Sequence, residues 1–201
     1  MMSFEPIRRA LSLPVDPVEW GAPDESAREA AVAVVLRPVA ESPQPELLMI
    51  RRAEKEGDPW SGHMAFPGGR REPGDADLLH TARRESMEEV GLDLSRAAVL
   101  GRLVPIRTPM NRTFLPQMVV HSWAFGLPEV SELHPNPEVA SIHWFNLERF
   151  LRGEGRGTFT YNWQGTPLEL PCVRMDDCFI WGMSLRLLDD LVERLRRGDA
   201  S

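Results

Sequence analysis

Three glutamates in one segment carry the clearest chemical signal in the sequence. Glu85, Glu88 and Glu89 lie in a stretch predicted to be helical from about Asp77 to Val90, where roughly 100° per residue brings them within about a quarter turn of one another. Like charges at these spacings repel, and negative charge is unfavourable near a helix C-terminus. An oxygen-seeking divalent cation relieves both penalties, so the cluster predicts Mg²⁺ or Mn²⁺ binding. The alternative is a solvated acidic face without a ligand.

Polar residues beside the cluster extend this candidate site. A glycine turn, Gly68-Gly69, precedes the helix, and two acids, Glu72 and Asp75, follow the turn. Arg84 flanks the glutamates and can hold a carboxylate in place by charge-assisted hydrogen bonds. Two interpretations of Glu72 and Asp75 stay open: they bind an additional ion, or they solvate the turn.

Regular elements must hold this helix in place. Asp75 or Asp77 is suited to cap its N-terminus, and Gly91 to end it. Apolar runs predict strands at Ala30–Arg37, Glu46–Arg51, Val99–Arg107, Gln117–Ala124 and Ser141–Phe145, and the leucine spacing predicts a last helix at about Trp181–Arg196. The first two strands could form a hairpin, whereas the Gly- and Pro-rich residues 53–74 predict a loop. The pattern indicates an α/β fold with helices packed on a sheet.

Length and composition narrow the class of protein. With 201 residues, 42% of them hydrophobic, we expect one globular domain at 30–201 after an N-terminal lead-in at 1–29. A net charge of −7 argues against a nucleic-acid partner. No apolar run is long enough for a spanning helix and no signal peptide is evident, so we expect a cytoplasmic protein without a membrane partner. Cys172 and Cys178 are expected to be free thiols.

The motif around the glutamates resembles the Nudix box, G-x5-E-x7-R-E-U-x-E-E-x-G-U, in which U is a bulky aliphatic residue. Its fixed positions are matched by Gly69, Arg84, Glu85, Glu88, Glu89, Gly91 and Leu92. The chain departs from it in three ways: Asp75 replaces the first glutamate, eight residues separate Asp75 from Arg84, and Ser86 replaces an aliphatic residue. The resemblance implies the Nudix α/β/α sandwich with a mixed β-sheet, and a hydrolase acting on a pyrophosphate bond.

Within that family the chain is similar to the coenzyme A pyrophosphatase branch. The Asp75 spacing, the segment from Gly62 to Gly69 and the late segment Ile180–Ser184 carry this similarity, and Arg52-Ala53 fits approximately. Asp58 stands where that branch has a second arginine. The resemblance therefore implies coenzyme A or a derivative as the substrate. The Asp58 replacement instead favours ADP-ribose, a dinucleotide or a nucleoside triphosphate.

The same resemblance implies roles for individual residues. Metal binding by Mg²⁺ or Mn²⁺ is assigned to Glu85, Glu89, Glu88 and the carbonyl of Gly69. Catalysis is assigned to Arg84, Glu85 and Glu88, and substrate binding to Arg52, Gly68 and Gly69. The metals would neutralise charge on the leaving phosphate and lower the pKa of an attacking water, and the candidates for the general base are Glu88 and Glu138. A homodimer is also common in the family.

Two non-enzymatic hypotheses and three further candidate residues complete the set of expectations. A non-catalytic nucleotide-sensing Nudix module normally loses box glutamates, and here all three are present. A partner-binding domain with a coincidental acidic helix would bind no metal-dependent ligand. His63 could contact phosphate, and Trp60 or Trp163 could stack on a base, but structural packing is the more common use of each of these residue types.

Overall fold

The structure is a computed structural model that describes residues 3–13, 27–40, 42–58, 60–108, 117–163 and 165–199. A mixed sheet of eight strands forms its centre, with the main path in the order β3-β2-β1-β7-β5. β4 pairs with β1, β6 with β7, and β8 with β2. The strands are β1 (Arg28–Arg37), β2 (Glu46–Arg52), β3 (Met64–Ala65), β4 (Gly68–Arg70), β5 (Ala98–Arg102), β6 (Ile106–Arg107), β7 (Met118–Gly126) and β8 (Val139–Asn146).

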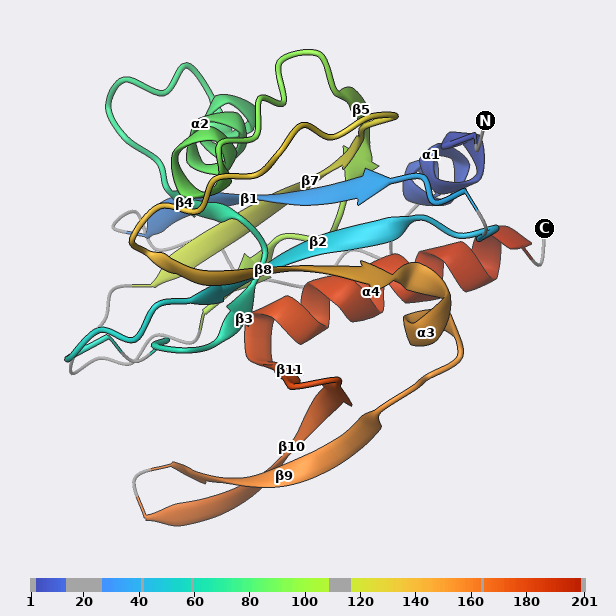
Figure 1. Cartoon of the computed structure of the whole chain (residues 1–201). Helices are drawn as coiled ribbons and strands as arrows, with labels where there is room; N and C mark the ends of the chain where they lie inside the picture. The colour runs from blue at the N-terminus through green and yellow to red at the C-terminus, as the bar shows by residue number, and fades with distance from the viewer. Residues whose placement is uncertain are drawn as a thin grey trace.

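Helices cover both faces of this sheet (Figure 1). One face carries α2 (Leu78–Val90), and the other carries α4 (Gly182–Asp199). The N-terminal helix α1 (Glu5–Ser12) packs against α4 and β5. The result is the α/β/α sandwich with a mixed sheet that the sequence predicted.

Side chains alternate across the sheet and build two cores. In β2, Leu48 and Ile50 pack in the core under α2, whereas Leu47 and Met49 pack in the core against α4. Because both faces are buried, the central strands read as nearly continuous apolar runs. The same alternation places the two arginines that end β2 on opposite faces. Arg52 therefore lies on the α2 face of the sheet, and Arg51 lies on the α4 face.

A second, smaller sheet follows the main one in the chain. A short helix, α3 (Leu147–Leu151), leads into β9 (Arg156–Trp163), β10 (Thr166–Met175) and β11 (Cys178–Trp181), which form an antiparallel three-stranded sheet in the order β11-β10-β9. Figure 1 shows β9 and β10 projecting away from the main sheet, while β11 runs directly into α4. The rings of Phe159, Phe179 and Trp181 meet edge to face at centroid distances of 5.0 to 5.2 Å.

The elements agree with the sequence predictions in most places and differ in three. The strand predicted at 99–107 is two strands, β5 and β6, and the loop predicted at 53–74 contains β3 and β4. The small sheet was not predicted. Cys172 and Cys178 are free, as expected, and no helix in the described part of the chain could span a membrane. Residues 1–2 and 14–26 of the lead-in lie outside the described residues, and its boundary with the domain stays a prediction.

Candidate active site

The limits of α2 place the glutamates in its last two turns. Asp77 caps the N-terminus, where its side chain accepts a 2.7 Å hydrogen bond from the His80 N–H. Gly91 ends the helix at φ 68°, a left-handed conformation that glycine adopts without strain, and its N–H donates to the Met87 carbonyl. Of the two candidate N-caps, the structure therefore selects Asp77.

Glu89 is the most deeply buried member of the cluster. Its residue exposure is only 3%, and its Oε2 accepts a 2.8 Å hydrogen bond from the Gly68 N–H. Burial raises the pKa of Glu89 to about 7, although the Gly68 hydrogen bond opposes that rise. The charge of nearby Arg52 and the Gly68 hydrogen bond do not offset the burial of Glu89, and a bound cation would stabilise the ionised carboxylate further.

Glu85 lies directly against the glycine turn. A side chain at Gly69 would meet both carboxylate oxygens of Glu85, and a side chain at Gly68 would collide with the backbone of β1 at Val32. Burial raises the pKa of Glu85 as well, and the neighbouring Arg84 opposes that rise. Position 68 therefore requires glycine, because only bare backbone lets β4 approach β1 so closely, and a side chain at Gly69 would displace the Glu85 carboxylate.

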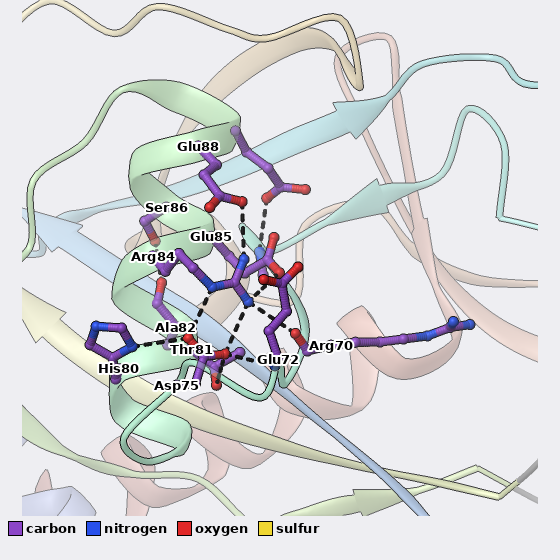
Figure 2. Close-up of polar contacts among 12 residues, drawn as sticks. Arg70, Glu72, Asp75, His80, Thr81, Ala82, Arg84, Glu85, Ser86 and Glu88 are labelled. Carbon is purple, nitrogen blue, oxygen red and sulfur yellow. Dashed lines mark hydrogen bonds and ion pairs between the residues drawn. The ribbon is translucent and has the colours of Figure 1, made fainter.

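Arg84 connects the cluster to the rest of the site (Figure 2). Its guanidinium donates to both oxygens of Asp75, at 3.0 and 3.1 Å, and to the Arg70 carbonyl at 3.0 Å. The same group lies 3.0 Å from Glu85 Oε1 and 3.0 Å from Glu88 Oε2. These contacts tie Arg84 to three carboxylates and orient two of the glutamates, and its catalytic assignment stays a prediction.

Asp75 anchors that arginine. Its side chain is 1% exposed and also accepts hydrogen bonds from the Glu72 N–H and the Thr81 hydroxyl. The Arg84 hydrogen bonds hold the pKa of Asp75 well below its usual range. The Asp75 carboxylate bonds the backbone of the turn at Glu72, as one of the two interpretations expected, and binding of an additional ion by Asp75 stays a prediction. Glu72 is exposed and lies close to the Arg84 guanidinium (Figure 2).

Arg52 lies near Glu89 on the same face of the sheet, and Asp58 forms an ion pair with the Arg52 guanidinium. Arg52 Nη2 and Asp58 Oδ2 are 2.8 Å apart, and the other Asp58 oxygen accepts from the Trp60 N–H at 3.0 Å. Arg52 Nε is buried and has no hydrogen-bond partner among the described residues. The residue that departs from the coenzyme A branch therefore neutralises a predicted substrate-binding arginine.

The remaining candidates lie at the edge of the site. The charge of Glu138 opposes ionisation of Glu89, although Glu138 itself is exposed. His63 contacts the Trp181 ring at 5.0 Å, which is a packing role, and Trp60 is half-buried. The side chain of Trp163 lies outside the described residues.

An open hollow of about 540 Å³ adjoins the Arg84 network and was not predicted. It is lined by Ala27, Arg28, Glu29, Arg70, Arg71, Glu72, Pro73 and Asp75. Two consecutive arginines directly after the Gly-Gly turn were the signal in the sequence that could have indicated it. The hollow is lined by three arginines and three acids, and one of these arginines, Arg71, is paired with Glu29 at 3.1 Å.

Comparisons with known proteins agree with this geometry. Residues 27–161 match the Nudix domain model. An uncharacterized protein of Schizosaccharomyces pombe is 38% identical over 113 residues, which cover 55% of this chain and 34% of that protein. The mitochondrial coenzyme A diphosphatase of Mus musculus is 29% identical over 175 residues, which cover 86% of this chain and 81% of that protein.

A solved structure shows the same fold. The Nudix domain of Shewanella oneidensis NrtR, complexed with ADP ribose, has a TM-score of 0.55 at 16% identity, and the match covers 90% of this chain and 94% of that one. The family model covers more than half of the chain, and Glu85 and Glu89 of the box lie against the glycine turn. The chain belongs to the Nudix family and is a Nudix pyrophosphohydrolase.

Proposed function

We propose that the protein hydrolyses the pyrophosphate bond of coenzyme A or a close derivative. The observation that carries the reaction is the pair of buried Glu89 and half-buried Glu85, held against the backbone of Gly68-Gly69. The substrate is supported by the segments that resemble the coenzyme A branch and by the similarity to the mouse coenzyme A diphosphatase over most of both chains. The products would be phosphopantetheine and adenosine 3′,5′-bisphosphate.

The residues present fit a hard divalent cation. Burial raises the pKa of Glu85 and of Glu89, so a bound cation would stabilise both carboxylates, and the carbonyl of Gly69, whose Cα lies against Glu85, would be a further ligand. Glu88 is more exposed, with 54% of its side chain accessible, and would share a second ion. An all-oxygen, anionic donor set suits Mg²⁺ or Mn²⁺. When bound, the metal would lower the pKa of the attacking water and neutralise charge on the phosphates.

Residues of the chain would orient the metal ligands and accept the proton of the attacking water. Arg84 holds Glu85 and Glu88 in fixed directions, and Gly68 fixes Glu89 through its N–H. Glu88 is the stronger candidate for the general base, because its exposed carboxylate can reach a water at the surface of the cluster. Glu138 remains the second candidate for this role. Arg52, with the backbone of Gly68 and Gly69, would contact the phosphates of the substrate.

A second substrate class is favoured by one observation, the Arg52–Asp58 ion pair at 2.8 Å. This pair removes a positive charge that a 3′-phosphate would otherwise use, so ADP-ribose, dinucleotides or nucleoside triphosphates are the alternative substrates. A nucleotide-sensing module ranks lower because Glu85, Glu88 and Glu89 are all present and clustered. A cytoplasmic location, a homodimer and the absence of nucleic-acid partners stay predictions.

Turnover of a substrate panel tests the proposal. We would measure kcat/KM for coenzyme A, ADP-ribose, NADH, diadenosine polyphosphates and nucleoside triphosphates with Mg²⁺ and with Mn²⁺, beside a Glu89→Gln control. The proposal expects coenzyme A to have the highest kcat/KM and the control to lose activity. Preference for another diphosphate would assign the protein to the alternative class, and no turnover of any compound would contradict the proposal.

A further inference from the structure

A second cluster of potential metal ligands lies away from the glutamates. The turn between β10 and β11 brings Asp177 and Cys178 against His143 of β8. Cys178 Sγ lies 3.4 Å from His143 Nδ1 and 3.5 Å from Asp177 Oδ1. One nitrogen, one sulfur and one oxygen donor all lie within 4.8 Å of one another, close enough to share a single ion.

This cluster lies on the opposite face of the main sheet from Glu89. His143 pairs with Met49 of β2, whose side chain packs in the core against α4, and paired residues of neighbouring strands point to the same face. Glu89, in contrast, belongs to α2 on the other face. The site is therefore separate from the candidate active site.

Neighbouring groups orient His143 and Asp177 so that each directs one donor atom toward the Cys178 sulfur. Ser141 Oγ lies 2.7 Å from His143 Nε2, so an Nε2–H that donates to Ser141 leaves the Nδ1 lone pair directed at the sulfur. Arg51 donates to Asp177 Oδ2 at 3.0 Å and to the Asp177 carbonyl at 2.8 Å, which leaves Oδ1 facing the sulfur. Outer partners of this kind orient the ligands of metal sites.

The donor types indicate which cation would fit. A thiolate and an imidazole select a borderline cation such as Zn²⁺ over Mg²⁺, and a carboxylate is a common third zinc ligand. Cys178 is buried and Asp177 is exposed, so a water can complete a tetrahedron from the open side. On binding, the Cys178 thiol would release its proton to solvent as the sulfur–metal bond forms. Arg51 also lies 3.6 Å from the sulfur, and its positive charge limits the affinity.

We propose that His143, Asp177 and Cys178 form a zinc-type metal site that ties the small sheet to the main sheet. The ligands come from β8 of the main sheet and from the β10–β11 turn, so one ion would cross-link elements that the chain joins through α3 and β9. β11 also carries Trp181, whose ring contacts His63 just before the glycine turn. The metal site would thereby hold the small sheet near the segment that leads into the glycine turn.

Cobalt substitution tests this site independently of activity. The full-length protein, stripped of metal and kept under a non-thiol reductant, would be titrated with Co²⁺ while thiolate-to-cobalt charge-transfer absorption is recorded. Only a sulfur ligand produces this band, so ions at the glutamate cluster do not contribute to it. We expect a saturable band in the wild type that Zn²⁺ displaces and that disappears in Cys178→Ser.

Matched variants separate ligand loss from misfolding. Cys172→Ser removes the other buried cysteine and should keep the band. Asp177→Asn changes a side chain that is 71% exposed, so its fold should persist while cobalt binds more weakly. Ser141→Ala should weaken binding by roughly ten- to hundred-fold. Circular dichroism would verify the fold of each variant. A folded wild type without the band, or a band unaffected by His143→Asn and Asp177→Asn, would overturn the proposal.

Discussion

Replacing Glu89 with glutamine should stabilise the metal-free protein above neutral pH, although the change removes a predicted metal ligand. Burial places the pKa of Glu89 at about 7, against an ordinary value of 4.5. Between these two pH values the folded chain keeps a proton that the unfolded chain has lost. Stability falls with rising pH wherever the folded state binds more protons. The wild type therefore loses stability across this window, and the loss is complete above about pH 7.

The size of the effect follows from the same two pKa values. Ionising Glu89 in the folded chain costs about 3 kcal/mol more than ionising it in the unfolded chain. Glutamine is neutral at every pH and still offers an oxygen to the Gly68 N–H. We expect Glu89→Gln to be more stable than the wild type by up to about 3 kcal/mol at about pH 8. Near pH 4.5, the advantage should be less than about half a kcal/mol.

Urea unfolding in the presence of a chelator measures this difference. Tryptophan fluorescence would follow unfolding of both proteins at several values between about pH 4.5 and 8.5. Adding Mg²⁺ at the upper end should reverse the order, because a ligand stabilises only the chain that binds it. An advantage that does not change with pH, or a variant that is less stable at every pH, would refute the assignment of a costly buried charge to Glu89.

Three further changes test other parts of the site. Gly69→Ala should displace the Glu85 carboxylate and lower kcat by roughly a hundredfold, and an unchanged kcat in steady-state assays would contradict the close approach. Asp75→Asn should lower the free energy of unfolding by about 3 to 5 kcal/mol. Because the pKa of Asp75 is depressed, that difference, measured by urea unfolding, should shrink only as the pH falls below about 4. Asp58→Asn should free the charge of Arg52 and lower KM for coenzyme A more than KM for its 3′-dephosphorylated analogue, whereas equal changes would argue against a 3′-phosphate contact.

Much of the fold could be predicted from local patterns. The α2 boundaries follow from residues that act locally, Asp77 as an N-cap and Gly91 as a left-handed C-cap. The central strands follow from apolar runs such as Ala30–Arg37. The small sheet was missed although Phe159, Tyr161 and Trp163 recur at every second position, the period of a strand.

The site was less predictable, because its geometry depends on contacts across the chain. The spacing of Glu85, Glu88 and Glu89 indicated a shared helix face, but only the fold shows that Glu89 is buried and Glu88 exposed. The ion pair between Asp75 and Arg84 depends on how the segment between β4 and α2 packs against that helix. Likewise, the approach of Cys178 to His143 joins residues 35 apart in the chain, and no local pattern encodes it.

Manganese binding by the α2 glutamates is the most direct test of the central claim. Electron paramagnetic resonance of free Mn²⁺ would give its affinity for the wild type, Glu85→Gln and Glu89→Gln, with coenzyme A hydrolysis measured on the same samples. We expect the wild type to bind Mn²⁺ and cleave the substrate, and both variants to lose metal affinity and turnover together. Wild-type Mn²⁺ affinity in both variants would contradict the claim that these carboxylates hold the catalytic metal.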